Sequence, residues 1–157
     1  THGTVGRTFL QRLGMTGASA GGHLALWLAS AEQPPAGLAG VVALAPVASL
    51  AEAHRLHLSH DAAVELLGGT PDQEPAAWAA ADPARLGLTL PAVVLTGAND
   101  DEVPGSVVAA YQEGREVDEP VTFSEVVGAG HYDLIDPDHA AYLTLLAHLE
   151  QLAIGLG

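Results

Sequence analysis

A serine lies at the centre of the motif Gly17-Ala18-Ser19-Ala20-Gly21, which has the form Gly-x-Ser-x-Gly. A short apolar stretch precedes the motif and a helical pattern follows it, so the serine is expected on a tight turn between a strand and a helix. Glycine two positions before and after the serine would avoid a steric clash in such a turn. The pattern predicts a nucleophilic hydroxyl at the tip of the turn, although a serine that only caps the helix would give the same spacing.

An acid and a histidine follow this serine along the chain, each just after an apolar run. Asp100 lies within residues 97–104, and His131 lies within residues 128–133. A neutral serine is a poor nucleophile, and an imidazole with an ordinary pKa of about 6.5 can accept its proton near neutral pH. A carboxylate would hold that imidazole in the required tautomer. We therefore expect Ser19, Asp100 and His131 to act together, with Asp101 as the competing acid.

The elements that must position these residues alternate between strands and helices. Continuous apolar runs predict strands that are buried on both faces, as in a parallel sheet, at residues 13–16, 39–45, 92–96 and 121–127. Helices are predicted at residues 20–31, 61–67, 73–80 and 106–116, and residues 47–60 are expected to be irregular. This order predicts an α/β fold, an open parallel sheet with helices on both faces, in which chemistry gathers at the carboxyl ends of the strands.

Capping residues predict the boundaries of two helices. Asp61 is expected to cap the helix that stops at Gly68-Gly69, and Asp136-Pro137 is expected to open the last helix of the chain. A leucine repeat in that last helix predicts the apolar stripe that packs on the sheet: Leu143, Leu146, Leu149 and Leu152.

Composition narrows the classes of function. The 157 residues carry a formal net charge of −14, with five arginines and no lysine, so nucleic acid and anionic membrane are not expected as partners. The chain has no cysteine, which excludes disulfides, thiolate zinc sites and a cysteine nucleophile. No apolar run is long enough to span a bilayer. We expect a globular chain, and the composition is compatible with the cytoplasm.

Three further histidines suggest an alternative chemistry. His54, His57 and His60 are spaced by three residues and lie beside Asp61. Imidazoles one helical turn apart can share a metal ion. Exposed histidines on a connecting segment explain the same pattern, and that interpretation is favoured. We therefore expect neither a metal site nor a cofactor.

Three segments resemble the signature segments of the α/β-hydrolase family: residues 17–25 (GASAGGHLA), residues 97–104 (with Gly97, Asp100, Val103 and Pro104) and residues 130–133 (GHYD). The similarity is to the branch that contains prolyl-oligopeptidase-like hydrolases, small carboxylesterases and kynurenine-formamidase-like enzymes. It implies a serine hydrolase that cleaves a small-molecule ester, or an amide or peptide bond, through an acyl-enzyme on Ser19. The serine, acid and histidine occur in the family's chain order. The resemblance assigns the backbone N–H of Ala20 to the oxyanion hole.

The resemblance covers only the carboxyl-terminal half of the family's fold. In the family, further strands and a His-Gly-Gly-type loop precede the serine turn, and that loop supplies a second oxyanion donor. His2-Gly3 is not followed by glycine. We therefore expect residues 1–157 to form a single domain that lacks its amino-terminal strands and leaves the serine strand at a sheet edge. A homo-oligomer or a missing amino-terminal half would complete the sheet. The competing hypotheses are an impaired domain that serves as an interaction module or is inert, and an acyltransferase.

Overall fold

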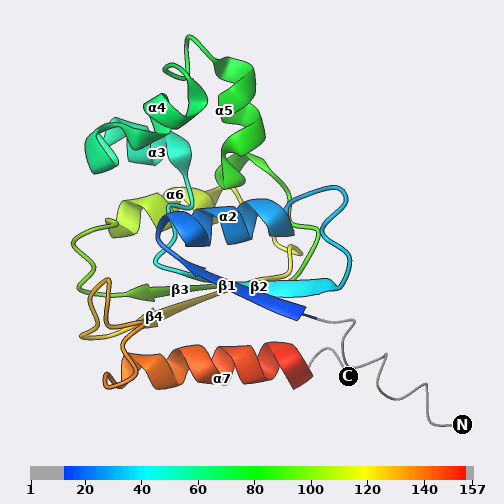
Figure 1. The fold of residues 1–157 in the computed structure, drawn as a ribbon, viewed down its shortest axis with the longest axis vertical. Helices are drawn as coiled ribbons and strands as arrows, with labels where there is room; N and C mark the ends of the chain where they lie inside the picture. The colour runs from blue at the N-terminus through cyan, green and yellow to red at the C-terminus, as the bar shows by residue number, and fades with distance from the viewer. Residues whose placement is uncertain (1–12, 155–157) are drawn as a thin grey trace, which may run out of the picture.

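A parallel four-stranded sheet forms the centre of the computed structural model, which describes residues 13–154. The strands are β1 (Leu13–Ala18), β2 (Leu38–Leu44), β3 (Ala92–Gly97) and β4 (Val121–Val126). They lie side by side in chain order, so β1 and β4 are the outer strands (Figure 1). Ala18 pairs with Leu44 and Leu44 pairs with Leu95, so β1 and β2 end level with one another and β3 continues two residues further, to Gly97. All four predicted strands are confirmed.

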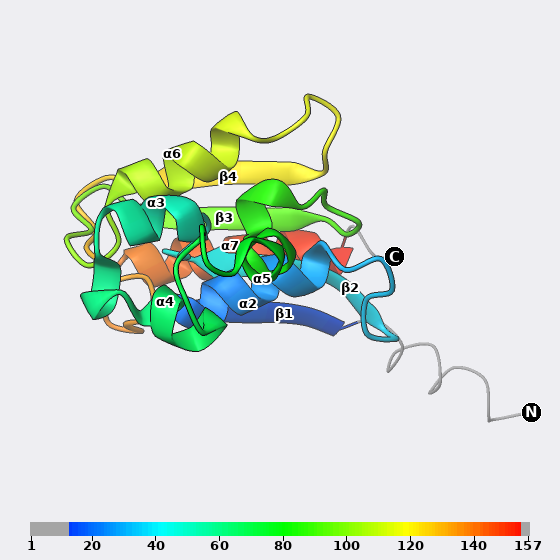
Figure 2. The same cartoon turned by 90° about the horizontal axis from the view of Figure 1, so that it is seen from above.

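Helices cover both faces of this sheet, as the sequence predicts. Helices α2 (Ala20–Ala29) and α6 (Gly105–Glu113) lie on one face, and α7 (Ala141–Ile154) lies on the other (Figure 1). Three short helices form a further layer outside α2 and α6 (Figure 1), which Figure 2 shows from above. These are α3 (Leu50–Arg55), α4 (Ala62–Leu67) and α5 (Pro75–Ala81), accompanied by the 3₁₀ turns η1 (Leu58–His60) and η2 (Pro83–Arg85).

Helix α3 corrects the prediction that residues 47–60 are irregular. The Ser49 side chain accepts a hydrogen bond from the Glu52 amide, and Asp82 accepts from the amides of Leu50 and Ala51. The start of α3 is therefore capped twice, once from a distance of about thirty residues along the chain. Serine followed three residues later by glutamate is a helix-start signal that the sequence already contained.

The start of α4 also differs from its prediction. Asp61 precedes the helix in a left-handed backbone conformation, with φ 62°, and its side chain makes no capping bond. Its carboxylate accepts hydrogen bonds from His54 and His57 instead. The predicted stop is confirmed, because Gly68 ends the helix with φ 80°, a conformation in which glycine pays no steric penalty.

The last helix starts later than predicted, at Ala141 and not at Asp136-Pro137. The Asp136 carboxylate accepts from the Asp138 amide at 2.9 Å, which closes a tight turn in place of a helix cap. The His139 imidazole then accepts the amide hydrogen of Ala141 at 3.1 Å and satisfies one free donor at the true helix start.

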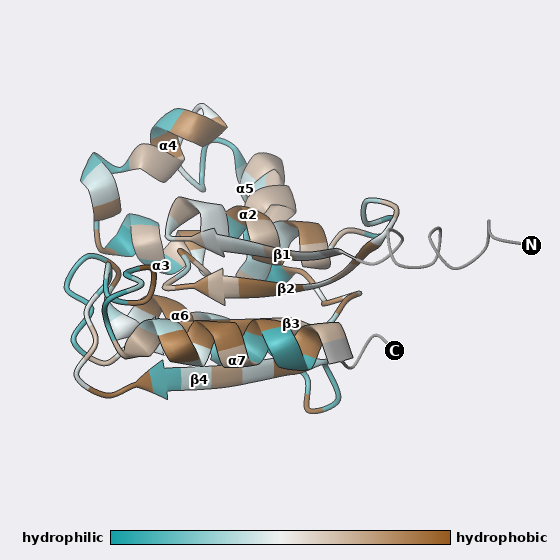
Figure 3. Ribbon diagram, turned by 60° about the horizontal axis from the view of Figure 1, so that its bottom comes forward, coloured by the Kyte–Doolittle hydropathy of each residue, from teal (hydrophilic) through white to brown (hydrophobic). Residues whose placement is uncertain are grey.

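The predicted leucine stripe of α7 is also wrong in half of its members. Leu143 is 66% exposed and Leu146 is 42% exposed, whereas Leu145 is buried at 5%. Leu149 and Leu152 do pack against the core on this face of the sheet. Steps of three residues drift around a helix of 3.6 residues per turn, so a long run of them leaves the buried face. Figure 3 shows hydrophobic residues along most of α7, so the positions of the leucines in the sequence did not show which of them face the sheet.

Replacement of Leu145 by alanine should therefore destabilise the fold by about 2–5 kcal/mol, because it removes a buried side chain and leaves a cavity. Leu143→Ala, on the same helix, should change the free energy of unfolding by less than about 0.5 kcal/mol. Urea unfolding of both variants measures the difference. Equal losses, or a larger loss at Leu143, would contradict the packing described for α7.

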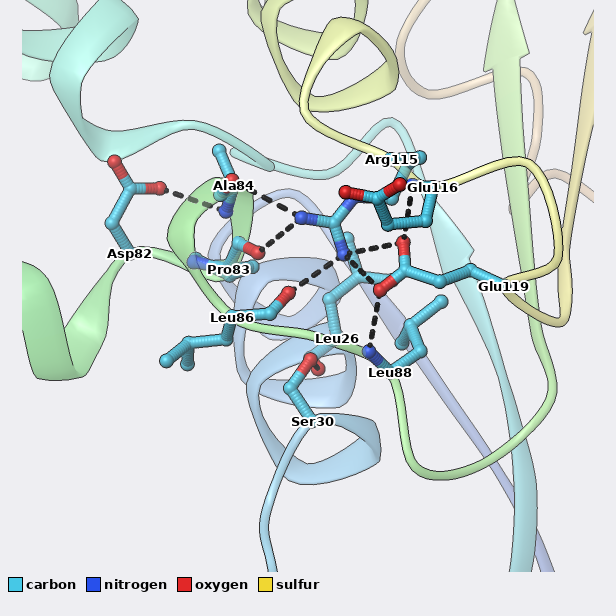
Figure 4. Close-up of polar contacts among 10 residues, drawn as sticks. All are labelled: Leu26, Ser30, Asp82, Pro83, Ala84, Leu86, Leu88, Arg115, Glu116 and Glu119. Atoms are coloured by element: carbon cyan, nitrogen blue, oxygen red, sulfur yellow. Dashed lines mark hydrogen bonds and ion pairs between the residues drawn. The ribbon is translucent and has the colours of Figure 1, made fainter.

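A buried arginine ties the segment after α5 to the segment after α6 (Figure 4). The Arg115 guanidinium donates to the carbonyl oxygens of Leu86 at 2.7 Å and Ala84 at 3.1 Å, and it pairs with Glu119 at 3.2 Å. Its side chain is only 5% exposed. Below it lies the ring of Tyr111, 4.4 Å from the guanidinium carbon to the ring centroid. The charge is thus compensated at several points, as a buried cation requires.

Burial raises the pKa of Tyr111 to about 12, and its buried hydroxyl has no hydrogen-bond partner. The folded state therefore favours the neutral phenol. The associated stability is complete below the unfolded pKa of about 10 and is lost as the pH rises towards 12. Tyr111→Phe should be at least as stable as the parent at pH 7, because an unpartnered buried hydroxyl is removed, and its advantage in free energy of unfolding should grow above pH 10. Urea unfolding at pH 7 and pH 10.5 tests this; a large loss at pH 7 would show that the hydroxyl is bonded.

Candidate active site

Ser19 occupies a strained turn between β1 and α2. Its backbone has φ 54° and ψ −116°, a combination that is costly for a residue with a side chain. Its amide donates to the Leu44 carbonyl at 2.9 Å, and its carbonyl accepts from the amides of His23 and Val47. These three bonds to neighbouring elements hold the turn in place. The strand–turn–helix context predicted for the serine is confirmed.

The predicted need for glycine on both sides of the serine is confirmed on one side only. A side chain at Gly17 would collide with the carbonyl of Gly21, but a side chain at Gly21 itself would meet nothing within 4 Å. The second tight position is Gly22, where an added Cβ would lie 2.8 Å from the Cβ of Pro46. The sequence GASAGG contains both Gly21 and Gly22, and only the fold shows which of them has no room for a side chain.

The Ser19 hydroxyl does not cap α2, because no side-chain capping bond is formed at the start of this helix. Ala20 is the first helical residue, and the first amides of a helix have no acceptor within it. No acidic side chain lies in the first turn of α2. The partial positive charge of the helix start is therefore available beside the serine.

Asp100 and His131, which are 31 residues apart in the chain, meet at the carboxyl ends of β3 and β4. His131 Nδ1 lies 2.8 Å from Asp100 Oδ2, and the two side chains are only 7% and 5% exposed. A carboxylate has no proton to donate, so Nδ1 is the donor and Nε2 is left for another partner. Asp100 Oδ1 accepts from the amides of Val103 at 2.8 Å and Glu102 at 3.0 Å. The competing acid, Asp101, is exposed.

Close contacts between two loops position this pair. The Asn99 amide donates to the Ala129 carbonyl at 2.9 Å, and a side chain at Gly97 would collide with that same carbonyl. Within the histidine loop, the Gly130 amide donates to Asp133 Oδ2 at 2.7 Å. The loops that carry the acid and the histidine therefore form one packed unit.

The structure brings Asp100 and His131 together but leaves Ser19 outside their hydrogen bond. Among residues 13–154, no hydrogen bond joins the Ser19 hydroxyl to His131. The three residues follow β1, β3 and β4, which all end at the same edge of the sheet. His2 and Gly3 lie outside the described residues.

A pocket of about 320 Å³ lies behind the acid loop, between α6 and the strands β3 and β4. Thr96, Asp100, Phe123 and Glu125 are among its lining residues, whereas neither Ser19 nor His131 lines it. The pocket therefore adjoins the acid from the far side and is not the space in front of the serine.

Two of the three clustered histidines, His54 and His57, form hydrogen bonds to Asp61. His57 Nδ1 lies 2.8 Å from Asp61 and His54 Nδ1 lies 3.2 Å from it. The hydrogen bond from His57, followed by that from His54, lowers the pKa of Asp61 below its usual value. Within the part of the chain that the structure describes, no three metal-ligating side chains are grouped as a metal site requires.

Two α2 side chains and Asp82 are structural residues that the sequence analysis did not assign. His23 Nε2 lies 2.9 Å from the Ala81 carbonyl, and Trp27 Nε1 donates to the Ala80 carbonyl at 2.9 Å. Both fasten the end of α5 to α2. Asp82 follows at once and caps α3, so one short segment connects α2, α3 and α5.

The Asp100–His131 bond can be tested without any assumption about activity. Asp100→Asn should abolish the downfield proton resonance of the His131 Nδ1–H, because the charged acceptor is lost. Asp101→Asn, an exposed neighbouring carboxylate, should leave that resonance in place. Proton NMR of both variants measures it. Loss of the resonance in Asp101→Asn alone would contradict the assignment of Asp100.

No helix between residues 13 and 154 combines the length and the apolar character that a membrane crossing requires.

Comparisons with known proteins agree with the α/β fold described above. A family model described as the prolyl oligopeptidase family matches residues 5–150. A search of curated proteins finds no match. Among solved structures, esterase B from Lactobacillus rhamnosis, inhibited by a tributyrin phosphonate, is 20% identical with a TM-score of 0.67. The match covers 92% of this chain and 52% of that one.

Two other solved structures are similar to a comparable degree. A butyrate-bound thermophilic esterase from the planctomycete Thermogutta terrifontis is 21% identical, with a TM-score of 0.65 and coverage of 94% of this chain and 57% of that one. Dipeptidyl peptidase 4 from Porphyromonas gingivalis is 18% identical, with a TM-score of 0.66 and coverage of 91% and 19%. The chain thus spans about half the length of these esterases and a fifth of the peptidase.

Proposed function

Because this chain belongs to the prolyl oligopeptidase family of α/β-hydrolases, we propose that it is a serine hydrolase that forms an acyl-enzyme on Ser19. Its substrate is a small-molecule ester in the first instance, or an amide or peptide. The family consists of serine hydrolases that include peptidases and esterases. Both esterases similar to this chain hold short-acyl compounds, a tributyrin phosphonate and butyrate. Short-chain esters are therefore the first substrates to test.

One observation carries the proposal: the buried hydrogen bond between Asp100 and His131 at 2.8 Å. The Asp100 carboxylate accepts two backbone amides and the Nδ1–H of His131, and this last bond fixes Nδ1 as the protonated ring nitrogen. The free Nε2 is then the basic atom. A base oriented in this way, on the sheet edge that also carries a strained serine turn, is the arrangement that nucleophilic catalysis needs.

In the acylation step, the Ser19 oxygen attacks the substrate carbonyl carbon and its proton passes to His131 Nε2. The carbonyl oxygen becomes an oxyanion, which the Ala20 N–H and the start of α2 stabilise. The bond to the leaving group then breaks as His131 returns the proton to it. The charge of Asp100 stabilises the imidazolium that exists between these two transfers.

In the deacylation step, a water molecule attacks the Ser19 ester and gives its proton to His131 Nε2. The second tetrahedral intermediate collapses, the carboxylic acid leaves, and the proton returns to the Ser19 oxygen. No metal or cofactor takes part in this scheme. An alcohol in place of water would give acyl transfer, and product analysis with added alcohol separates the two outcomes.

A specific observation favours a second candidate, an interaction module of low activity. The serine strand β1 is an outer strand of the sheet, and the described residues pair it only with β2. The removal of one of two oxyanion donors costs about 10²–10³ in rate.

We propose that strands from outside residues 13–154, or from a second copy, complete the sheet beside β1 and bring the second donor.

Labelling with a fluorophosphonate probe, followed by peptide mass spectrometry, tests the proposal. We expect one adduct, on Ser19, that Ser19→Ala abolishes and that forms about 10²–10⁴ times more slowly in His131→Ala. Hydrolysis of short-chain esters should fall in parallel. His60→Ala, which changes an exposed histidine outside the proposed triad, is the matched control and should label at the parent rate.

The two candidate functions predict different results. A folded chain, shown to be so by circular dichroism, that forms no adduct would contradict the hydrolase and favour the interaction module. An adduct on Ser19 that His131→Ala does not slow would contradict the role of His131.

A further inference from the structure

The turn after β4 exposes two large apolar side chains beside the proposed base. Tyr132 is 65% exposed and Ile135 is 47% exposed, while Leu134 between them is fully buried. The Ile135 amide donates to the Tyr132 carbonyl at 3.1 Å and closes the turn. Leu134 anchors the turn in the core, and the Tyr132 and Ile135 side chains are exposed on either side of it.

Tyr132 also contacts His131 directly. The two ring centroids are 5.0 Å apart and the planes are almost perpendicular, at 87°. This edge-to-face geometry is favourable for aromatic rings. The bond from Gly130 to Asp133 closes the loop around both residues. The imidazole therefore has Asp100 at Nδ1 and an exposed aromatic ring beside it.

The chemistry of the proposed reaction gives this ring a location relative to the substrate. The leaving group departs with the proton that His131 donates, so it must lie next to the imidazole at that moment. Tyr132 is the exposed aromatic side chain that contacts that imidazole. We propose that Tyr132 forms a wall of the leaving-group subsite and that the enzyme prefers substrates with aromatic leaving groups, an inference that rests on the proposed function.

The recognition would involve the ring and not the hydroxyl. Among the hydrogen bonds of residues 13–154, none holds the Tyr132 hydroxyl, and the contact with His131 is made by the ring. Tyr132→Phe keeps the ring and should keep the preference. Tyr132→Ala removes the ring, and it changes an exposed residue, so the fold should persist.

The test compares phenyl butyrate with ethyl butyrate, two esters with the same acyl group. In Tyr132→Ala the ratio of the two kcat/KM values should fall about 3- to 10-fold, the value of one aromatic contact, with the loss confined to the phenyl ester. Tyr132→Phe should retain the parent ratio. The intrinsic reactivity of the two esters cancels, because each ratio is compared between variants. Leu143→Ala, which alters an exposed side chain on α7, is the control and should also retain it.

A binding measurement keeps the inference separate from the proposed activity. Phenol, the product of the aromatic ester, should shift the imidazole NMR resonances of His131 in the parent and in Tyr132→Phe, but not in Tyr132→Ala. Ethanol should shift none of them. If the chain neither reacts with the fluorophosphonate probe nor hydrolyses the esters, the proposed function fails. The phenol titration alone then shows whether Tyr132 forms a binding site for an aromatic ring.

Where hydrolysis is measurable, the ratio decides. An unchanged ratio in Tyr132→Ala would overturn the assignment, as would equal losses for both esters. In the absence of hydrolysis, phenol shifts of the same size in Tyr132→Ala would overturn it.

Discussion

The hydrogen bond between Asp100 and His131 depends on most of the fold. Its two residues are 31 positions apart, and they meet only because β3 and β4 are parallel neighbours that end at one edge. The close approach of Gly97 to the Ala129 carbonyl brings the two loops together. A buried carboxylate is costly unless it is fully bonded, and Asp100 has two amides and an imidazole as its donors. The pair is therefore stable only while both loops keep their positions.

The serine turn is held by independent contacts after the outer strand β1, at the same carboxyl edge of the sheet. Ser19 adopts a positive φ because its backbone is bonded to Leu44, His23 and Val47 and because Gly17 and Gly22 leave no room for side chains. The strain is local, and the contacts of α2 with the core support it. The strained turn after β1 and the Asp100–His131 pair after β3 and β4 are the two parts that act together in the proposed reaction. Tyr132 extends the second part towards solvent.

The sequence was most informative where one physical effect dominates. Short continuous apolar runs that end at turn residues are typical of strands buried on both faces, and the places of Asp100 and His131 after such strands predicted that they would meet. Predictions failed where two local bonds compete. Asp136 can cap a helix or close a turn, and it closes a turn; Asp61 can cap α4, and it accepts from two histidines.

Packing details were beyond the sequence for a different reason. Leu143, Leu145 and Leu146 are all apolar, and the face that α7 turns towards the sheet determines which of them is buried. The same holds for Gly21 and Gly22, since the tighter position depends on where Pro46 lies. The sequence predicted the acid–histidine pair, whereas Tyr132 as its aromatic neighbour required the structure.

The most direct test of the central claim is detection of the acyl-enzyme itself. The chain, mixed with an activated butyrate ester and quenched with acid, would be digested and analysed by mass spectrometry. We predict a butyryl group on the peptide that contains Ser19, formed in a burst before steady-state turnover and absent in Ser19→Ala. A folded chain that turns over the ester with no adduct on Ser19, or with the adduct on another residue, would contradict the account.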